Sequence, residues 1–255
     1  MNSNEYGEVV ESHESFMSAR QRDITDMGLD DSLHDLALSL QSAATKYRYG
    51  YQQLWCGVPV IRLPDDIVLL QELVHELRPR GIVETGVARG GSLLLNASLM
   101  EIAGLRPRVL GIDIQIYEHA RNAVSSSRYK DSIVLLETDS TSETARSKVE
   151  TFTKQINENP MLLILDSNHS HSHVLAELQT LTGCLPVGSI VIVADTIVAE
   201  MPPTHYENRP WDSTNNPSTA ICSFLALNAN FALSTKWARR GLLSEMRDGI
   251  LVKVS

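Results

Sequence analysis

Two carboxylates stand at the ends of two apolar runs, where they could hold a divalent cation. The run "LLILD" ends on Asp166, and "SIVIVAD" ends on Asp195 and is followed by the hydroxyl of Thr196. Oxygen ligands of this kind suit a hard cation such as Mg²⁺. His169 follows Asp166 by one short loop and could act there as a general base. The alternative is that each acid only caps the helix that follows it.

A second candidate site is the turn "ETGVARGGS". Glu84 precedes Gly86, and Gly90 and Gly91 follow at a spacing that differs from the GxGxxG of dinucleotide-binding turns. A carboxylate aimed into such a turn would repel a pyrophosphate but attract the amino group of a methionine moiety. The turn therefore favours S-adenosylmethionine over NAD. The alternative is a glycine turn that only lets a helix and a strand pack closely.

Two further apolar runs also end in polar residues. "VLGIDI" ends near Asp113, which is placed to accept hydrogen bonds from both ribose hydroxyls of a nucleoside. "LLETDST" brings Asp139 and Ser140 within reach of an adenine. A single acid at such a position is more often a loop residue or a helix cap. Acids at the same end of successive strand–helix units favour a nucleoside site.

These residues need a parallel sheet to bring them together. "DDIVLLQELVHELRPRG" predicts an amphipathic helix, and β-branched runs separated by helical lengths follow it. The runs are "GIVET", "RVLGIDI", "SIVLLET", "MLLILD", "GSIVIVAD", "FALSTKW" and "GILVKV". This order predicts an α/β fold of about seven strands, mostly parallel, with helices on both faces and one late antiparallel strand. Ligands bind such sheets at the carboxyl ends of the strands.

Length and composition set the domain organisation. The chain has 255 residues, of which 43% are apolar, which is enough for one α/β domain with a covered sheet. We expect this domain to occupy residues 46–255. Residues 1–45 are polar with a weak helical pattern, and we expect a partly ordered arm that contributes to an oligomer or a lid.

Charge and cysteine usage exclude several classes of partner. A net charge of -9 disfavours a nucleic-acid partner. No apolar run approaches the roughly 18 residues of a membrane span, and the first residues lack the apolar segment of a signal peptide. The three cysteines are scattered and indicate neither a disulfide framework nor a zinc site. We expect a cytoplasmic protein without a membrane or nucleic-acid partner.

A long segment follows Asp195. "VAEMPPTHYENRPWDSTNNPSTA" spans Val198 to Ala220 and contains four prolines. A structureless loop of about 20 residues in a compact domain is more often a functional lid than an accident. We expect Tyr206 and Trp211 to offer flat faces to the ring of an acceptor substrate. The alternative is a surface excursion or an oligomer contact.

The segment "LWCGVPVIRLPDDIVLLQELVHELRPRGIVETGVARGGSLL" resembles the cephalosporin hydroxylase and rhamnosyl O-methyltransferase family. "WCGVP", "LRP", and "ETG" with "GGS" carry the likeness, which covers roughly residues 47 to 200. The resemblance implies a Rossmann-like class I methyltransferase fold that binds S-adenosylmethionine. It also implies a role for each candidate residue: Glu84, Gly86 and Ser92 for the methionine part, Asp113 for the ribose, Asp139 with Ser140 for the adenine side, Asp166 and Asp195 for Mg²⁺, and His169 as the base.

One position departs from the family. Ala194 stands where relatives often have a second acid beside Asp195, which puts metal affinity in doubt. The more distant catechol O-methyltransferase type also has an Ala-Asp pair, followed by an amide for which Thr196 could stand in.

The function that the resemblance implies is an S-adenosylmethionine-dependent O-methyltransferase, assisted by Mg²⁺. It would act on a hydroxyl of a small-molecule acceptor, with a sugar of the rhamnosyl type on a glycolipid or natural product favoured, as in antibiotic biosynthesis. We expect a homo-oligomer. Two alternatives stay open: a catechol-type enzyme that methylates a phenol, and a cofactor-binding accessory protein without catalysis.

Overall fold

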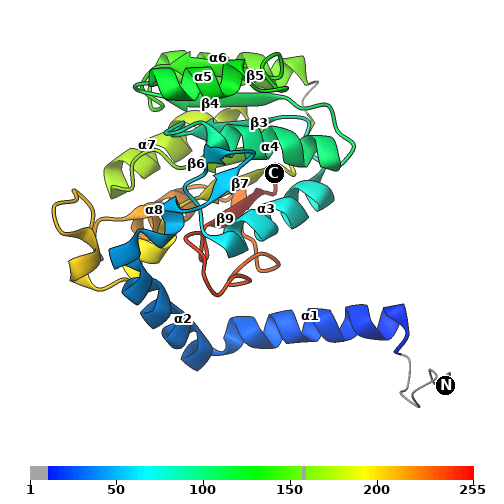
Figure 1. Ribbon diagram of the computed structural model, residues 1–255, viewed down its shortest axis with the longest axis vertical. Coiled ribbons are helices and arrows are strands. Elements are labelled where there is room, and N and C mark those ends of the chain that lie inside the picture. Colours follow the sequence, from blue (N-terminus) through cyan, green and yellow to red (C-terminus); the bar gives the residue numbers. More distant parts are fainter. Residues whose placement is uncertain (1–10, 157–158) are drawn as a thin grey trace.

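The central feature of the protein is a seven-stranded sheet. The computed structural model describes residues 11–156 and 159–255, and within them the strand order is β5-β4-β3-β6-β7-β9-β8 (Figure 1). All seven apolar runs form strands: β3 (Ile82–Thr85), β4 (Val109–Asp113), β5 (Ile133–Glu137), β6 (Leu162–Leu165), β7 (Ile190–Val193), β8 (Phe231–Leu233) and β9 (Ile250–Lys253). The predicted α/β class and strand number are confirmed.

The direction of the strands confirms the expected late antiparallel strand. β3 pairs in parallel with β4 on one side and with β6 on the other, and β6 pairs in parallel with β7. β9 runs antiparallel to both β7 and β8 and lies between them. The chain moves outward from β3 to β5 and then returns to β6, so the strand order reverses between β3 and β6. Ligands are expected outside the sheet at this point.

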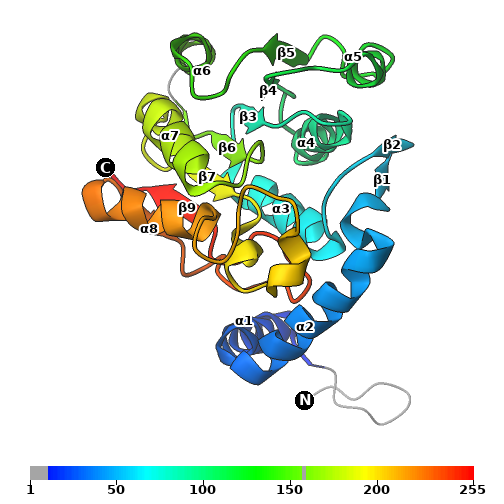
Figure 2. The same cartoon turned by 90° about the vertical axis from the view of Figure 1, so that its left-hand side faces the viewer.

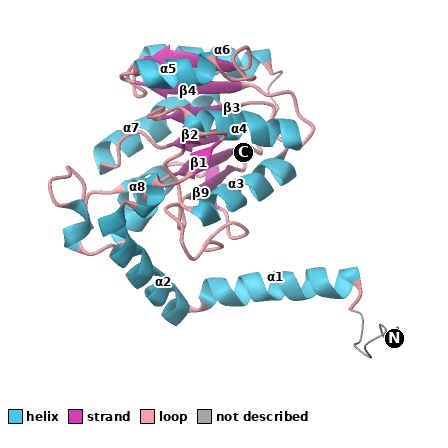
Figure 3. Cartoon of the chain, in the orientation of Figure 1, coloured by secondary structure: helices cyan, strands magenta, loops and turns pink. Residues whose placement is uncertain are grey.

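Helices cover both faces of the sheet (Figures 2 and 3). One face carries α3 (Pro64–Leu77), α4 (Gly91–Ile102) and α5 (Glu118–Ser125), and the other carries α6 (Glu143–Gln155), α7 (His171–Leu181) and α8 (Pro217–Leu227). Each face buries its own apolar cluster against the strands, with Leu93 and Met100 in one and Leu178 and Phe224 in the other. The sheet is therefore buried on both sides, as its continuous apolar strands require.

Local sequence signals explain where helix α3 begins and ends. Pro64 opens the helix, and Asp65 and Asp66 stand in its first turn, where the helix dipole favours negative charge. The helix ends at Arg78, whose φ of 50° is left-handed, and Pro79 prevents its continuation. The chain then enters β3, which leads directly into the glycine turn.

The N-terminal region forms two helices and short connecting elements. Helix α1 (His13–Leu29) buries none of its residues and runs below the rest of the molecule in Figure 1, where Arg20 pairs with Glu72 of α3 at 2.7 Å. Helix α2 (Asp31–Ala44) buries His34, whose backbone carbonyl accepts a hydrogen bond from Arg247 at 3.1 Å. The elements η1 (Thr45–Tyr47) and η2 (Tyr49–Tyr51) and the hairpin of β1 (Leu54–Trp55) and β2 (Val58–Pro59) lead to α3. Part of the predicted arm, residues 1–10, lies outside the described residues.

Within the described ranges, no helix is both long enough and apolar enough to cross a bilayer.

Candidate functional site

A cavity of about 600 Å³ opens where the strand order reverses, at the carboxyl ends of the central strands. The glycine turn forms one part of its wall, and the segments that follow β6 and β7 form another. The cavity brings together residues from both predicted sites: Glu84, Gly86, Ser92, Asp166, His169, Asp195 and Trp211. The two clusters identified separately in the sequence therefore share one space.

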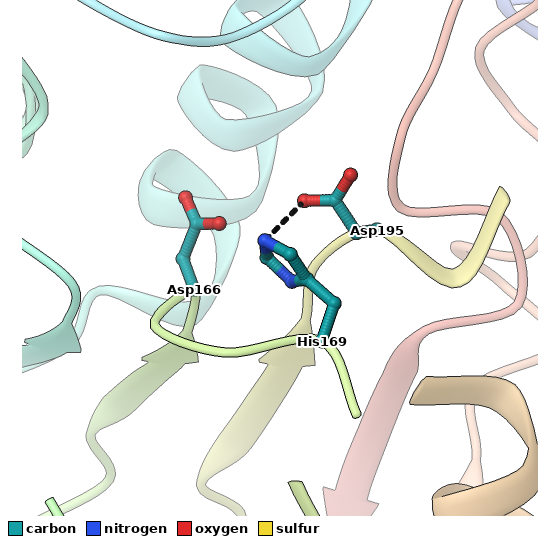
Figure 4. A group of neighbouring side chains, drawn as sticks. All are labelled: Asp166, His169 and Asp195. Carbon is teal, nitrogen blue, oxygen red and sulfur yellow. Dashed lines mark ion pairs between the residues drawn. The ribbon is translucent and has the colours of Figure 1, made fainter. Parts of the chain in front are cut away.

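The potential metal ligands converge beyond the ends of β6 and β7 (Figure 4). One ligand atom each from Asp166, His169 and Asp195 lies within 4.8 Å of the other two. Nε2 of His169 is 3.3 Å from Oδ2 of Asp195, and the side chains of both are less than one-third exposed. Asp195 has a left-handed φ of 55°, which ends the extended strand and starts the 3₁₀ turn η4 (Thr196–Ala199). Two carboxylates and an imidazole form a donor set that fits a divalent cation.

Negative charge accumulates around this cluster. Burial raises the pKa of Asp166, as does the nearby charge of Asp195, whereas Arg62 opposes the shift. Glu245, which also lines the cavity, has a pKa raised well above its usual value by burial and then by the charges of Asp195, Asp66 and Asp166. Carboxylates that raise one another's pKa in this way are stabilised by a bound cation. The electrostatics and the donor geometry thus agree.

Arg62 is a site residue that the sequence analysis did not identify. Its side chain is 2% exposed, and its Nη2 atom lies 3.1 Å from Oε1 of Glu84 and 3.3 Å from Oδ2 of Asp166. Nη1 contacts Sδ of Met246 at 3.7 Å. Burial alone would lower the pKa of this guanidinium, but the charges of Asp166 and Glu84 raise it above its usual value. One buried cation thus joins the glycine-turn carboxylate to the metal-site carboxylate.

The glycine turn is packed too closely for side chains. Gly86 has a φ of +87°, and a Cβ atom there would lie 2.0 Å from the backbone oxygen of Asp166. At Gly91 a Cβ atom would lie 2.1 Å from the backbone oxygen of Pro59. The turn therefore packs directly against the backbone of both segments, and it also forms part of the cavity wall. The functional interpretation and the packing interpretation of these glycines are compatible.

Glu84 is fully buried and well supplied with donors. It accepts hydrogen bonds from Ser92 and from Nδ2 of Asn96 at 2.7 Å, in addition to the Arg62 contact. Burial nevertheless raises its pKa, because desolvation outweighs these contacts. Ser92 and Asn96 lie in helix α4, which begins at Gly91 directly after the turn. The start of α4 therefore fixes the orientation of the Glu84 carboxylate.

Asp113 supports the glycine turn from the end of β4. Its Oδ2 atom accepts hydrogen bonds from the backbone N–H groups of Val87 at 2.7 Å and Ala88 at 3.3 Å. Asp113 itself does not line the cavity. The structure thus gives this acid a defined role in holding the turn, and its contact with a ribose stays a prediction.

Three other predicted residues have local partners outside the cavity. Asp139 accepts hydrogen bonds from the N–H and hydroxyl groups of Thr141 in the turn before α6. The Ser140 hydroxyl is 3.2 Å from Nε2 of His173. The Thr196 hydroxyl donates to the backbone carbonyls of Glu245 and Arg247, so it binds the C-terminal segment. Thr196, predicted as a metal ligand, is not part of the cluster of Asp166, His169 and Asp195, and the contact of Asp139 and Ser140 with an adenine stays a prediction.

The segment after β7 is more ordered than predicted. It contains η4 and the short element η5 (Pro203–Tyr206), and Asn216 forms a capping box that starts α8 at Pro217. The expectation of a structureless loop is therefore wrong: Asp212 accepts hydrogen bonds from the following backbone, and Asn215 accepts one from the N–H of His171 at 2.8 Å. These tethers hold the segment against the site.

Trp211 is an aromatic residue of this segment that reaches the cluster. Its ring meets the His169 ring edge-on, with centroids 4.8 Å apart. It also packs against the buried residues Ile197, Val198 and Met201. The predicted Tyr206 belongs to η5, but its side chain lies outside the described part of the chain. Trp211 is thus placed to contact a molecule bound next to His169.

The N-terminal region also contributes to the cavity. Its wall includes Gln41 and Thr45 and the residues of the turn that follows, Arg48, Tyr49, Gly50 and Tyr51. Leu38 of α2 packs against the apolar residues of η4. The predicted division after residue 45 therefore falls within a continuous wall of the site. No local sequence pattern indicates this contact, because the residues that meet are far apart along the chain.

Comparison with known proteins extends these observations. The model of the family described as Rhamnosyl O-methyltransferase/CmcI matches residues 47–254. A rhamnosyl O-methyltransferase of Mycobacterium leprae is 33% identical over 144 residues, which are 56% of this chain and 59% of that protein. One of Mycobacterium bovis is 28% identical over 158 residues, or 59% of this chain and 61% of that protein. The matches thus span about three-fifths of these relatives' length.

Solved structures agree in fold. A structure of CmcI with Mg and SAM has a TM-score of 0.55 and 24% sequence identity, and the likeness covers 80% of this chain and 78% of that one. An apo structure of CmcI gives a TM-score of 0.57 at 23% identity. The likeness extends over the seven-stranded, mostly parallel sheet of this chain, with its late antiparallel strand. With a family match that extends from η1 to the last strand, the chain belongs to the Rhamnosyl O-methyltransferase/CmcI family.

Proposed function

We propose that the protein is an S-adenosylmethionine-dependent O-methyltransferase that uses a divalent metal ion, Mg²⁺ by preference. The observation that carries this proposal is the convergence of Asp166, His169 and Asp195 in the cavity that the glycine turn also lines. Membership of the family and the names of its relatives support it. The buried carboxylates around the cluster favour cationic ligands, and both a metal ion and a sulfonium are cationic.

The glycine turn is the proposed site of the cofactor. Glu84 attracts the amino group of the methionine moiety, and Gly86 allows the backbone to approach it. Ser92 positions the carboxylate of Glu84 by a hydrogen bond. We assign the ribose to Asp113 and the adenine side to Asp139 and Ser140. The bound cofactor supplies a methyl group that is already activated for transfer.

Asp166 and Asp195 are the proposed metal ligands. A metal ion there would lower the pKa of an acceptor hydroxyl and fix its direction. His169 would accept the hydroxyl proton on its imidazole, so that the acceptor oxygen could take the methyl group that a bound S-adenosylmethionine would supply. Asp195 and Trp211 hold the imidazole in place from two sides. No covalent intermediate with the protein is needed. The protein would accelerate the transfer by aligning the acceptor oxygen with the methyl group and by excluding water from the cavity.

The acceptor is proposed to be a sugar hydroxyl on a glycolipid or natural product. The names of the mycobacterial relatives support a rhamnosyl sugar. Trp211 lines the cavity with the Arg209 guanidinium 5.3 Å from its ring centroid, and Arg48 adds hydrogen-bond donors from the N-terminal region. An aromatic face with flanking donors suits a sugar ring.

Self-association is a further part of the proposal. Large apolar side chains are exposed along the N-terminal helices, including Phe16, Leu29, Leu36 and Leu40, each more than half exposed. An exposed apolar surface of this kind favours a protein partner. We propose a second copy of the chain as that partner.

The decisive experiment follows methyl transfer from radiolabelled S-adenosylmethionine to a panel of rhamnosides and catechols. Activity with rhamnosides that stops in excess chelator and returns with Mg²⁺ is the expected result. We expect Asp195→Asn to reduce turnover far more than cofactor affinity, because this residue faces the acceptor oxygen. Methylation of catechols alone would favour the phenol alternative. Cofactor binding without transfer to any acceptor would favour the accessory alternative.

A further inference from the structure

We propose that Arg62 is a resident cation that competes with the metal ion for Asp166 and thereby sets the metal affinity of the site. This inference rests on the proposed function, in which Asp166 is a metal ligand. Arg62 is a positioning residue in this view, because it acts through two carboxylates and not on the acceptor.

One nitrogen of Arg62 lies between the carboxylate of the glycine turn and a carboxylate of the proposed metal site. Nη2 of Arg62 donates to Oε1 of Glu84 at 3.1 Å and to Oδ2 of Asp166 at 3.3 Å. Because the same atom serves both carboxylates, any movement of the guanidinium toward Glu84 weakens its contact with Asp166. The occupancy of the metal site and the position of Arg62 are therefore linked.

The burial of Arg62 makes this competition strong. Its side chain is 2% exposed, so water screens its charge little. A doubly charged ion at Asp166 and a guanidinium a few ångströms away repel each other. Even at an effective dielectric constant of about 20, this repulsion exceeds the free energy of a tenfold change in affinity.

The other nitrogens of Arg62 are held only weakly by polar contacts. Its Nε atom is buried without a hydrogen-bond partner among the described residues, and Nη1 has only the weakly accepting sulfur of Met246. Glu84 can retain the cation after Asp166 has been taken by a metal ion. Arg62 thus has one contact that competes with the metal ion, with Asp166, and a second contact, with Glu84, that it can keep when the metal ion is bound.

The test measures Mn²⁺ binding to the whole chain by electron paramagnetic resonance, without cofactor or acceptor. Arg62→Gln removes the charge, and Arg62→Lys keeps it. Arg247→Gln is the matched control, because Arg247 is about equally buried and its Nε also has no partner among the described residues. It pairs with Glu200 at 2.7 Å, whereas Arg62 pairs with Glu84 and Asp166. Asp166→Asn reports whether the bound ion is at the proposed site.

We expect Arg62→Gln to bind Mn²⁺ at least about tenfold more tightly than the wild type. Arg62→Lys and Arg247→Gln should stay within about threefold, and Asp166→Asn should abolish the site. Equal affinity in Arg62→Gln and the wild type, with binding lost in Asp166→Asn, would overturn the inference and leave the proposed function intact. Binding that Asp166→Asn does not affect, or no binding by any variant, would overturn both this inference and the metal assignment.

A measurement on the wild type covers the case in which Arg62→Gln does not fold. The Nε–H signal of Arg62 can be followed by ¹⁵N NMR during titration with Mg²⁺, with the Arg247 signal as internal reference. We expect the Arg62 signal to shift as the metal binds while the Arg247 signal stays in place. An unchanged Arg62 signal at saturating metal would show that the two cations do not compete.

Discussion

Replacing Gly86 by alanine tests whether the glycine turn and the metal site are built as one unit. The residue has a φ of +87°, and an added Cβ atom would lie 2.0 Å from the backbone oxygen of Asp166. The left-handed backbone costs a non-glycine residue about 1–2 kcal/mol. Overpacking adds about 1–3 kcal/mol, because the atom in the way is backbone and cannot rotate aside. The free energy of unfolding should therefore fall by about 2–5 kcal/mol.

Gly104 provides a matched control for the backbone cost alone. Its φ is +71°, and an added Cβ atom would have nothing within 4 Å. Gly104→Ala should lower the free energy of unfolding by only about 1–2 kcal/mol. Urea unfolding followed by circular dichroism gives both values. The difference between the two losses in free energy of unfolding gives the cost of the contact with the backbone oxygen of Asp166.

Gly86→Ala should also weaken metal binding, because the backbone of Asp166 must move to admit the new methyl group. Mn²⁺ affinity should fall in Gly86→Ala and stay unchanged in Gly104→Ala. If both variants lose the same stability within about 0.5 kcal/mol and bind Mn²⁺ equally, the close contact does not constrain the site and our reasoning is wrong.

Two further predictions concern residues that lie behind the cavity wall. Asp113→Ala leaves the N–H groups of Val87 and Ala88 without their acceptor, so we expect about 1–3 kcal/mol less stability and weaker binding of S-adenosylmethionine by calorimetry; unchanged binding would contradict the ribose assignment. His34 is held neutral, because burial, and then the charge of Arg247, lowers its pKa. Its stabilising contribution is therefore complete above the ordinary pKa of about 6.5 and is lost as the pH falls through the lower folded-state value. The protection factors of the α2 amides, corrected for the pH dependence of intrinsic exchange, should fall on acidification, and His34→Gln should remove this pH dependence.

The sheet could be predicted in full, because each strand is a short, continuous apolar run between turn signals. Asp166 and Asp195 were found for the same reason: a carboxylate directly after such a run must lie at the end of a buried strand. His169 was predicted from its short spacing to Asp166. All three are identified by local sequence, and the parallel topology then brings them together.

Arg62 and Glu245 could not be identified in this way. Each is an ordinary charged residue in an irregular segment, and its role comes from contacts with residues far along the chain, such as Arg62 with Asp166. Asp139 illustrates a different limit of prediction from sequence. An acid after a strand looks the same in sequence whether or not it also accepts hydrogen bonds from its own turn, as Asp139 does, so its proposed contact with an adenine stays a prediction.

The position of β9 has a consequence for biosynthesis. This strand is made last but lies between β7 and β8, and the residues just before it, including Glu245, complete the cavity wall. At roughly 5–20 residues per second, a ribosome needs roughly 3–11 s to pass from the end of β7 to the start of β9. During that time the apolar edge of β7 has no partner on that side, so the nascent chain is prone to aggregation and is a natural substrate for chaperones.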